Sequence, residues 1–282
     1  MKFLIIQENG RHIVSRHLRE CNSLQRALWF HGEECDVWGL GHDNFEKIPD
    51  YNSYDVIINL ENYDVGWVPD LSNYNKPIKL LWAIDSHCQG KQYYLNIFEK
   101  GKYTKILEAT RYYLDDNSVW FPNCYDSDFI VPIKEVEKKS LLGFCGNYCN
   151  RKPLFDAIKN YFPEFKFDID VRGIHMILAI NSYHVLFNKN IFNDINYRNF
   201  ETMGCGTCLL TNYDDQYKDL GFKDSENFFM YRSVEEAIEK INYLKSNPAV
   251  IKETAKNGYE FVKSKHTFKA RAKSLINYVQ TL

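Results

Sequence analysis

Three polar residues that could bind a nucleotide lie close together in the second half of the chain, at Asn196, Arg198 and Glu201. In a helix that begins at this point, residues 198 and 201 share one face and residue 196 lies near the N-terminus. A carboxylate that faces a pocket can accept hydrogen bonds from both hydroxyls of a ribose, and a guanidinium can hold a phosphate. A surface ion pair is the alternative interpretation of the same spacing.

A second group of candidate binding residues follows two apolar runs of the same half. Gly146 and Asn147 come directly after the run 140–145, and Arg151 stands just before the next helical pattern. A glycine lets the backbone approach an anion, and the arginine supplies a bidentate cation. Asn188 follows the run 183–187 in the same way. A simple turn after a strand is the alternative interpretation of Gly146.

Four cysteines suggest a different chemistry. Cys205 and Cys208 form a CxxC motif, and with Cys145 and Cys149 they would complete a four-cysteine zinc site. Cys145 and Cys208 lie inside apolar runs, however, where a thiol is most simply a small buried hydrophobe. The Asp-Ile-Asp at 168–170 lies in a predicted strand and not in a metal-binding loop, so we expect no metal site.

The first half carries candidates for a proton acceptor at the ends of its apolar runs. Asp85 and His87 follow the run 78–84, Glu61-Asn62-Tyr63 follows the run 54–60, and His12 follows the first run of the chain. A carboxylate or an imidazole in such a place can take a proton from a hydroxyl. Asp85 with Ser86 would alternatively cap a helix.

The elements that must position these residues alternate between short apolar runs and helical patterns. After the first run, Val14, Leu18, Cys21, Leu24 and Leu28 fall on one helical face. Ser233 followed by Glu236 forms a capping box before a helix, and Pro248 opens another. Apolar runs that predict parallel strands occur at 2–7, 35–40, 54–60, 78–84, 104–109, 118–122, 140–147, 166–170, 183–188 and 206–212.

The order of these elements predicts an α/β protein of two Rossmann-like domains that face a cleft. With 282 residues the chain is long enough for two domains. A polar, charge-rich passage at 125–139 marks the junction, which gives a first domain at 1–135 and a second at 136–265. The C-terminal helix at 266–282 is expected to cross back to the first domain.

Composition and charge limit the function. Hydrophobic residues make up 45% and charged residues 26%, as in a folded globular protein. Residues 1–135 carry 14 Lys and Arg against 20 Asp and Glu, and the remainder carries 21 against 17. The basic second half suits an anionic small ligand, whereas the acidic first half argues against a long nucleic-acid track.

The sequence shows no sign of export. There is no run of about 18 apolar residues, and the N-terminus turns polar after five residues, so neither a membrane span nor a secretory signal is predicted. The expected location is the cytoplasm, or the host cytoplasm for a viral protein, where the eight cysteines would stay reduced.

Residues 187–271 resemble the C-terminal donor domain of GT-B glycosyltransferases, most closely the branch of the CgeB-like proteins of spore maturation. The resemblance is carried by Asn-x-Arg-x-x-Glu at 196–201, the Gly-Cys-Gly turn, the strand ending in Thr-Asn, the segment FFMYRSVEEAIEKI and the His-Thr-Phe at 266–268. The stretch LGFCGNYCNR at 142–151 extends it upstream.

This resemblance implies a nucleotide-diphosphate sugar as co-substrate, preferably a UDP-sugar, and no required cofactor. Glu201 would bind the ribose, and Gly146 with Asn147 would lie near the diphosphate. Retaining members carry a second glutamate eight residues earlier, where this chain has Asn193 and then Asp194. Retention or inversion of the anomeric configuration therefore stays open.

The expected activity is metal-independent transfer of a sugar, preferably a hexose, to a hydroxyl. The acceptor is left open among a glycan, a protein, a metabolite and a modified DNA base. Two alternatives share the architecture: a nucleotide-sugar-binding module without catalysis, and a sugar-nucleotide epimerase.

Overall fold

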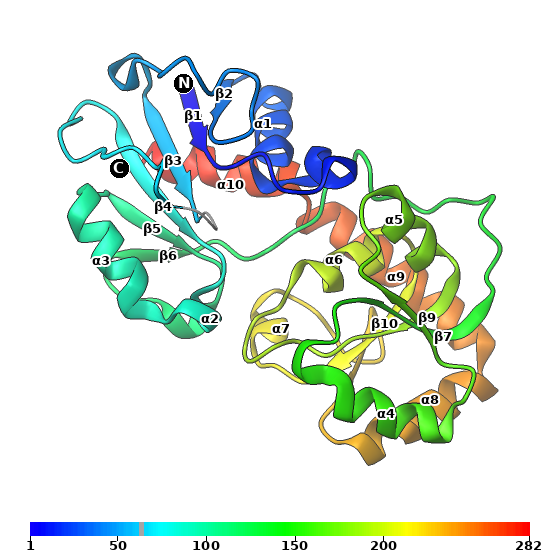
Figure 1. Cartoon of the computed structure of the whole chain (residues 1–282). Helices are drawn as coiled ribbons and strands as arrows, with labels where there is room; N and C mark the ends of the chain where they lie inside the picture. The colour runs from blue at the N-terminus through cyan, green and yellow to red at the C-terminus, as the bar shows by residue number, and fades with distance from the viewer. Residues whose placement is uncertain (62–64) are drawn as a thin grey trace. The chain divides into compact units, whose positions relative to one another are not determined.

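The computed structural model describes residues 1–61 and 65–282, which form two compact units (Figure 1). Unit 1 contains Met1–Asn123 together with Phe268–Leu282, and unit 2 contains Cys124–Thr267. Each unit is a parallel β-sheet flanked by helices, which confirms the predicted α/β class with two Rossmann-like domains. Of the helices in the described part of the chain, none has both the length and the apolar composition needed to cross a membrane.

The described residues of unit 1 form a six-stranded sheet in the order β2-β1-β3-β4-β5-β6, and every pair is parallel. The apolar runs of the first half form these strands, as predicted. Their bounds are β1 Lys2–Ile6, β2 Glu34–Trp38, β3 Val56–Leu60, β4 Ile78–Ala83, β5 Lys105–Glu108 and β6 Ser118–Trp120.

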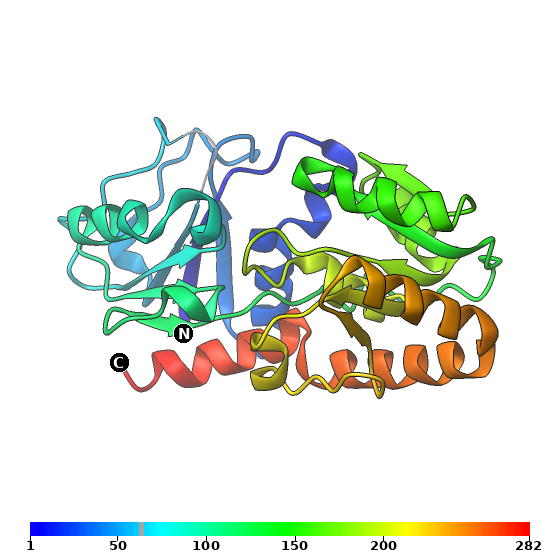
Figure 2. The same ribbon diagram turned by 90° about the horizontal axis from the view of Figure 1, so that it is seen from below.

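Helices pack beside these strands. One of these helices, α10, comes from the end of the chain and connects no strands. The C-terminal helix α10 lies beside α1 (Figures 1 and 2), and Nε2 of His31 lies 2.8 Å from the carbonyl oxygen of Lys269. The helices of unit 1 are α1 Glu20–Phe30, α2 Ser86–Gln89, α3 Lys91–Gly101 and α10 Phe268–Val279, with 3-10 helices at Ile13–Leu18, Tyr51–Ser53 and Arg111–Tyr113.

The first helix is shorter than the apolar pattern predicts. Val14 belongs to a 3-10 helix without buried residues and is 57% exposed, whereas Cys21, Leu24 and Leu28 of α1 are buried. The break lies at Arg19, whose extended backbone separates the two helices. The prediction of one continuous helical face from Val14 is therefore wrong, because only the part after Arg19 packs against the sheet.

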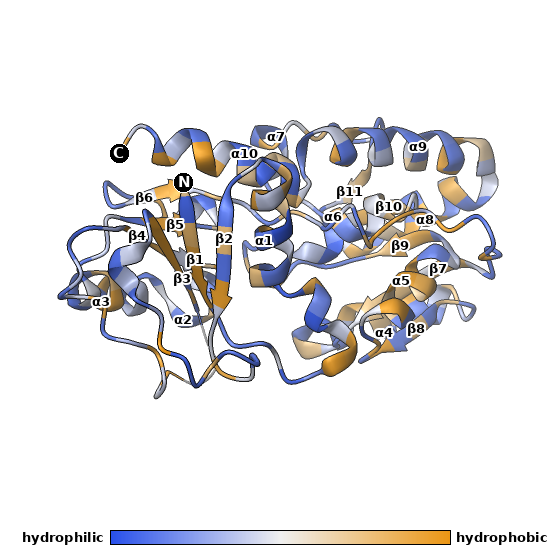
Figure 3. Cartoon of the chain, turned by 90° about the horizontal axis from the view of Figure 1, so that it is seen from above, coloured by the Kyte–Doolittle hydropathy of each residue, from blue (hydrophilic) through white to orange (hydrophobic). Residues whose placement is uncertain are grey.

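The core of unit 1 lies on the central strands. Figure 3 shows β1, β3 and β4 as strongly hydrophobic, and all five residues of β3 are buried. Strands that are covered on both faces need continuous apolar runs and not an alternating pattern, which is why these runs were recognisable in the sequence.

Unit 2, all of whose residues are described, has a five-stranded parallel sheet in the order β11-β10-β9-β7-β8. The strands are β7 Ser140–Gly146, β8 Lys166–Ile169, β9 Tyr183–Phe187, β10 Cys208–Asn212 and β11 Phe229–Tyr231. The helices are α4 Lys152–Tyr161, α5 Ile174–Asn181, α6 Tyr197–Gly204, α7 Gln216–Asp219, α8 Val234–Ser246 and α9 Pro248–Lys265. A 3-10 helix at Cys149–Arg151 precedes α4.

Local signals place the ends of these helices. The Ser233 hydroxyl accepts a hydrogen bond from the backbone N–H of Glu236, and Pro248 is the first residue of α9. The carboxylate of Glu236 reaches back to the backbone N–H of Arg232, one residue before the cap. The predicted cap of α8 is confirmed.

The CxxC motif forms the turn between α6 and β10, as the hydrophobic pattern predicts. A Cβ on Gly204 would lie 2.5 Å from the ring of Tyr125, and Gly206 has φ +65. Both positions therefore require glycine, one for close packing and one for its backbone conformation. Cys205 and Cys208 on either side are buried, and burial raises the pKa of Cys208 to about 12.

Candidate functional site

The candidate binding residues of unit 2 lie where strands β7 and β9 end and helix α6 begins. Asn196 occupies the N-cap of α6, and its side chain accepts a hydrogen bond from the backbone N–H of Arg198 at 3.1 Å. The sequence placed the start of this helix correctly because an asparagine cap is a local signal. The first turn of α6 therefore presents its free backbone N–H groups at the carboxyl edge of the sheet.

Arg198 and Glu201 form a close pair on α6. Nη1 of Arg198 lies 2.8 Å from Oε2 of Glu201, and the side chains are 18% and 14% exposed. Burial by itself would lower the pKa of Arg198, but the surrounding groups, with the Glu201 carboxylate first among them, together raise that pKa. The contact is an ion pair whose geometry is not that of a hydrogen bond, so the guanidinium keeps N–H groups to donate.

A buried network of amides holds the loop that precedes α6. The Asn188 amide donates to Asn190 at 3.2 Å and to Asn199 at 3.1 Å, and the Asn199 amide donates to Asn190 at 2.8 Å. The Tyr217 hydroxyl donates to Asn199 at 2.9 Å. Asn188 is only 1% exposed, so in this structure its side chain fixes the loop and does not line an open site.

The loop after β7 is held by Arg151, which follows this loop in the sequence. Nε of Arg151 donates to the carbonyl of Lys189 at 2.5 Å, and Nη1 donates to the carbonyl of Asn147 at 3.0 Å. The guanidinium thus connects the loops that follow β7 and β9. Burial lowers the pKa of Arg151. Gly146 in this loop has φ +149, in the region that favours glycine.

The cysteines near this edge do not form a cluster. Cys145 is buried in β7, and burial raises the pKa of its thiol to about 11, whereas Cys149 is exposed. In the described ranges 1–61 and 65–282, no group of three or more His, Cys, Asp or Glu side chains is arranged to hold a metal ion.

The carboxyl edge of unit 1 carries acidic side chains. Glu61 follows β3, and its Oε2 accepts hydrogen bonds from the backbone N–H groups of Ile84 at 3.1 Å and Asp85 at 2.9 Å. The hydroxyl of Tyr94 on α3 donates to the same oxygen. These three contacts use Oε2, and the carboxyl group of Glu61 also interacts with the side chain of Asp85.

Glu61 and Asp85 form a coupled pair of carboxyl groups. Burial first, and the charge of Asp85 second, raise the pKa of Glu61 to about 7. Burial also raises the pKa of Asp85. Because two neighbouring carboxyl groups resist joint ionisation, the pair loses its last proton only close to neutral pH, and the carboxylate formed there can accept a proton as a general base does.

The other predicted base candidates have different surroundings. Asp85 occupies the N-cap of α2, but its side chain makes no capping hydrogen bond to a described residue. His87 lies on α2, and burial lowers its pKa. His12 is exposed at the start of the 3-10 helix after β1. Asn62 and Tyr63, named with Glu61 in the sequence, lie outside the described residues.

Glu108 at the end of β5 is a buried carboxyl group of another kind. Burial raises its pKa to about 7, as for Glu61. Its Oε2 accepts from the Ser86 hydroxyl at 2.7 Å and its Oε1 from the backbone N–H of Thr110 at 3.0 Å. With both oxygens engaged and 3% exposure, Glu108 anchors the start of α2.

Comparison with known protein families supports a transferase. Residues 154–277 match the family described as glycosyl transferase-like, which covers most of unit 2 and the C-terminal helix. A search of curated protein sequences finds no match.

Solved structures with a similar fold include glycosyltransferases. The chain superimposes on Anabaena HepE in complex with UDP and glucose with a TM-score of 0.70 at 10% identity, covering 100% of both chains. Sucrose-phosphate synthase from Thermosynechococcus elongatus gives 0.67 at 11% identity, covering 100% of this chain and 99% of the other. An alpha-glucosyltransferase in complex with UDP and a 13-mer DNA gives 0.68 at 12% identity, covering 99% and 100%. The two parallel-sheet units therefore have the GT-B fold.

Proposed function

We propose that this chain is a glycosyltransferase of the CgeB-like branch that moves a hexosyl group from a nucleotide-diphosphate sugar to a hydroxyl acceptor. The observation that carries the proposal is the Arg198–Glu201 pair on α6, which lies within the segment that matches the glycosyl transferase-like family. The preferred donor is a UDP-sugar, since structural neighbours were solved with UDP or UDP-glucose. The proposed location is the cytoplasm.

Unit 2 would be the donor domain, because its carboxyl edge combines donors and an acceptor for a nucleotide. Glu201 would accept hydrogen bonds from the ribose hydroxyls, and Arg198 would donate to a phosphate. The backbone of Gly146 and Asn147 would approach the diphosphate. Arg151 would hold that loop in place through the carbonyl of Asn147. Asn188 would act indirectly, through the buried amide network.

The transfer step would need a base for the acceptor and charge stabilisation for the leaving group. The acceptor oxygen attacks the anomeric carbon, and the bond from this carbon to the diphosphate oxygen breaks with its electron pair staying on the diphosphate. The acceptor proton passes to the Glu61–Asp85 pair, with His87 as the alternative base. Arg198 and Arg151 would stabilise the developing negative charge in place of a metal ion.

Nucleotide binding is the first test. UDP, GDP, ADP and CMP, each added to the purified full chain in a thermal-shift series, should give one strong stabiliser, with UDP preferred. A ligand that binds only the folded protein raises its melting temperature by mass action. Glu201→Gln should weaken the affinity for that nucleotide about 10-fold or more, measured by isothermal titration calorimetry, because a charged hydrogen-bond acceptor is lost.

Glu226→Gln is the matched control for this test. Glu226 also pairs with a cation three residues away on the same unit, Lys223, but the two side chains are 57% and 66% exposed. The affinity of the Glu226→Gln variant for the nucleotide should stay within about twofold of the wild-type value, because an exposed surface ion pair contributes little. Failure of all four nucleotides to stabilise the protein would reject the donor site. Binding without hydrolysis or transfer of any donor sugar would favour a binding module without catalysis.

A further inference from the structure

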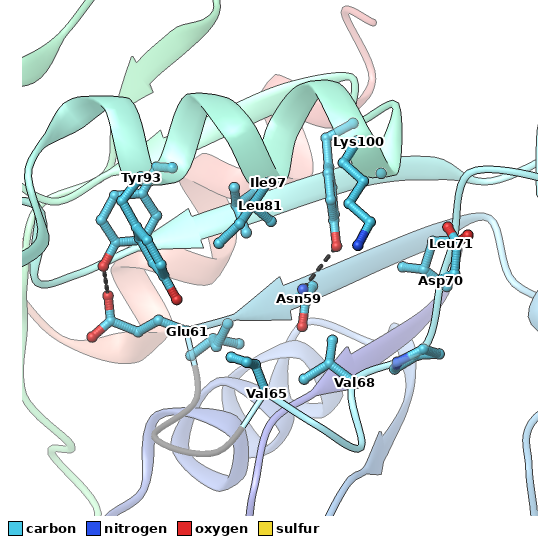
Figure 4. A pocket seen from close by; sticks show the side chains of 15 residues that line it. Asn59, Glu61, Val65, Val68, Asp70, Leu71, Leu81, Tyr93, Ile97 and Lys100 are labelled. Carbon is cyan, nitrogen blue, oxygen red and sulfur yellow. Dashed lines mark hydrogen bonds between the residues drawn. The ribbon is translucent and has the colours of Figure 1, made fainter.

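Unit 1 contains a cavity of about 300 Å³ that the proposed donor site does not use (Figure 4). It lies between strands β3 and β4, helix α3 and the loop 65–71. Most of the surface is apolar, with contributions from Leu60, Val68, Leu71, Leu81 and Ile97. This size and lining suit a small molecule with a hydrophobic body.

The cavity wall holds a buried polar atom without a partner. Nδ2 of Asn59 donates to the hydroxyl of Tyr103 at 2.7 Å, but Oδ1 of Asn59 accepts no hydrogen bond from the described residues. Asn59 is 4% exposed, and Figure 4 shows its oxygen on the side of Val68, away from the bond to Tyr103. A buried acceptor of this kind is costly unless a ligand supplies a donor.

One end of the cavity is formed by Glu61. The hydroxyl of Tyr94 on α3 donates to Oε2 of Glu61, a hydrogen bond drawn as a dashed line in Figure 4, and the same oxygen accepts from the backbone N–H groups of Ile84 and Asp85. Because Glu61 lines the cavity, its carboxyl group is within reach of a hydroxyl that enters there. The proposed base therefore lies in the wall of the hydrophobic cavity.

The charges of the lining argue against a polyanion. Lys100 is the only cation among the described lining residues, against the acids Glu61 and Asp70. A nucleic-acid acceptor needs an excess of positive charge. The apolar walls also offer few partners for the many hydroxyls of a glycan.

We propose that this cavity is the acceptor site, and that the acceptor is a neutral, largely apolar small molecule that presents one hydroxyl to Glu61 and a second donor group to Asn59. The inference rests on the proposed glycosyl transfer, because it assigns the substrate class of that reaction.

The test uses 2,7-dihydroxynaphthalene, 4-propylresorcinol and 1,8-octanediol as probes, because each has an apolar body and two hydroxyls, with D-glucose as a polar comparison. Binding to the full chain without nucleotide is measured by calorimetry, and transfer is measured with the nucleotide sugar found in the thermal-shift series. Ile97→Trp and, from the opposite wall, Val68→Phe fill the cavity. Ile13→Trp is the matched control, since Ile13 of unit 1 is 75% exposed and lies outside the cavity.

At least one apolar alcohol should bind and be glycosylated, whereas glucose should do neither. Both filling variants should weaken that binding and slow the transfer at least 10-fold, with the melting temperature showing that they are folded, and Ile13→Trp should change neither. Absence of binding by all three alcohols, or equal binding to both filling variants, would overturn the inference.

Two further outcomes separate this inference from the proposed function. Transfer from the nucleotide sugar to another acceptor that both filling variants leave unchanged would reject the acceptor class while the glycosyltransferase proposal stands. Binding of an alcohol in the cavity by a chain that binds no nucleotide would reject the acceptor role together with the proposed function.

Discussion

The carboxyl edges of the two sheets differ in chemistry although the units share a fold. In unit 2 the edge presents the ion pair of Arg198 and Glu201, near a buried amide network that links Asn188, Asn190 and Asn199. In unit 1 the edge presents the coupled carboxyl groups of Glu61 and Asp85 beside a hydrophobic cavity. We therefore propose that the same strand-end position binds an anion in unit 2 and accepts a proton in unit 1.

This difference shows how surroundings decide what a carboxylate can do. Glu201 lies beside a guanidinium, with which it forms an ion pair. Glu61 lies in a buried place beside another carboxyl group, which favours the protonated form. Binding and proton transfer are therefore expected to respond to different substitutions.

The largest expected effect separates turnover from nucleotide binding. Glu61→Gln should lower kcat by about 10²- to 10⁴-fold, because the glutamine amide cannot accept the acceptor proton. Its affinity for the nucleotide, which is expected to bind in unit 2, should stay unchanged. Steady-state kinetics and calorimetry on the same preparation measure the two quantities.

Glu108→Gln is the control for this prediction. Glu108 is buried like Glu61 and has a pKa raised to about the same value, but both of its oxygens are engaged by Ser86 and Thr110. The Glu108→Gln variant should be less stable in a urea titration, because hydrogen bonds of a buried group are weakened. Its kcat per folded molecule should stay within about threefold of wild type, because Glu108 is not expected to contact the substrate. Equal losses of kcat in both variants would show that burial alone explains the effect at residue 61.

A smaller effect is expected in the pH dependence. Since Glu61 must lose its proton before it can act as a base, kcat/KM should rise with pH through about 7 and then level off. Asp85→Asn removes a charge that raises the pKa of Glu61, so the rise should move to lower pH. At pH values below the rise, a shift of the profile by one pH unit changes kcat/KM about tenfold. If Asp85→Asn instead abolishes transfer at every pH, Asp85 is the base.

The smallest expected effect concerns the loop after β7. Gly146→Ala forces an alanine into φ +149, and its Cβ would lie 3.2 Å from the ring of Phe144. Nucleotide affinity should fall about three- to tenfold, since the backbone near the diphosphate must move, and about 1–3 kcal/mol of strain is expected.

Gly32→Ala provides the comparison for the loop. Gly32 in unit 1 has φ +81 with open space around it, so its substitution also strains the backbone but touches no proposed site. It should lower the melting temperature and leave nucleotide affinity unchanged. A comparable loss of affinity in both variants would mean that the Gly146 loop does not approach the nucleotide.

Much of the fold could be predicted because its signals are local. Strands covered on both faces form apolar runs, such as the one that becomes β3, and Asn196 and Ser233 cap helices within three residues of their own position. The prediction of one continuous helix from Val14 was wrong, because the spacing of apolar residues does not show where the chain leaves the surface of the sheet.

The sequence alone determined the α/β class, ten of the eleven strands found in the described residues, and the placement of Arg198 and Glu201 on one helix face; β11 was not predicted. These depend on periods of a few residues. Only the tertiary structure brought Glu61 to the backbone of Asp85 and to Tyr94, and placed Asn59 beside Tyr103. Such contacts join residues far apart in the chain, and the perturbed pKa of Glu61 exists only once folding removes water and brings a second carboxyl group beside it.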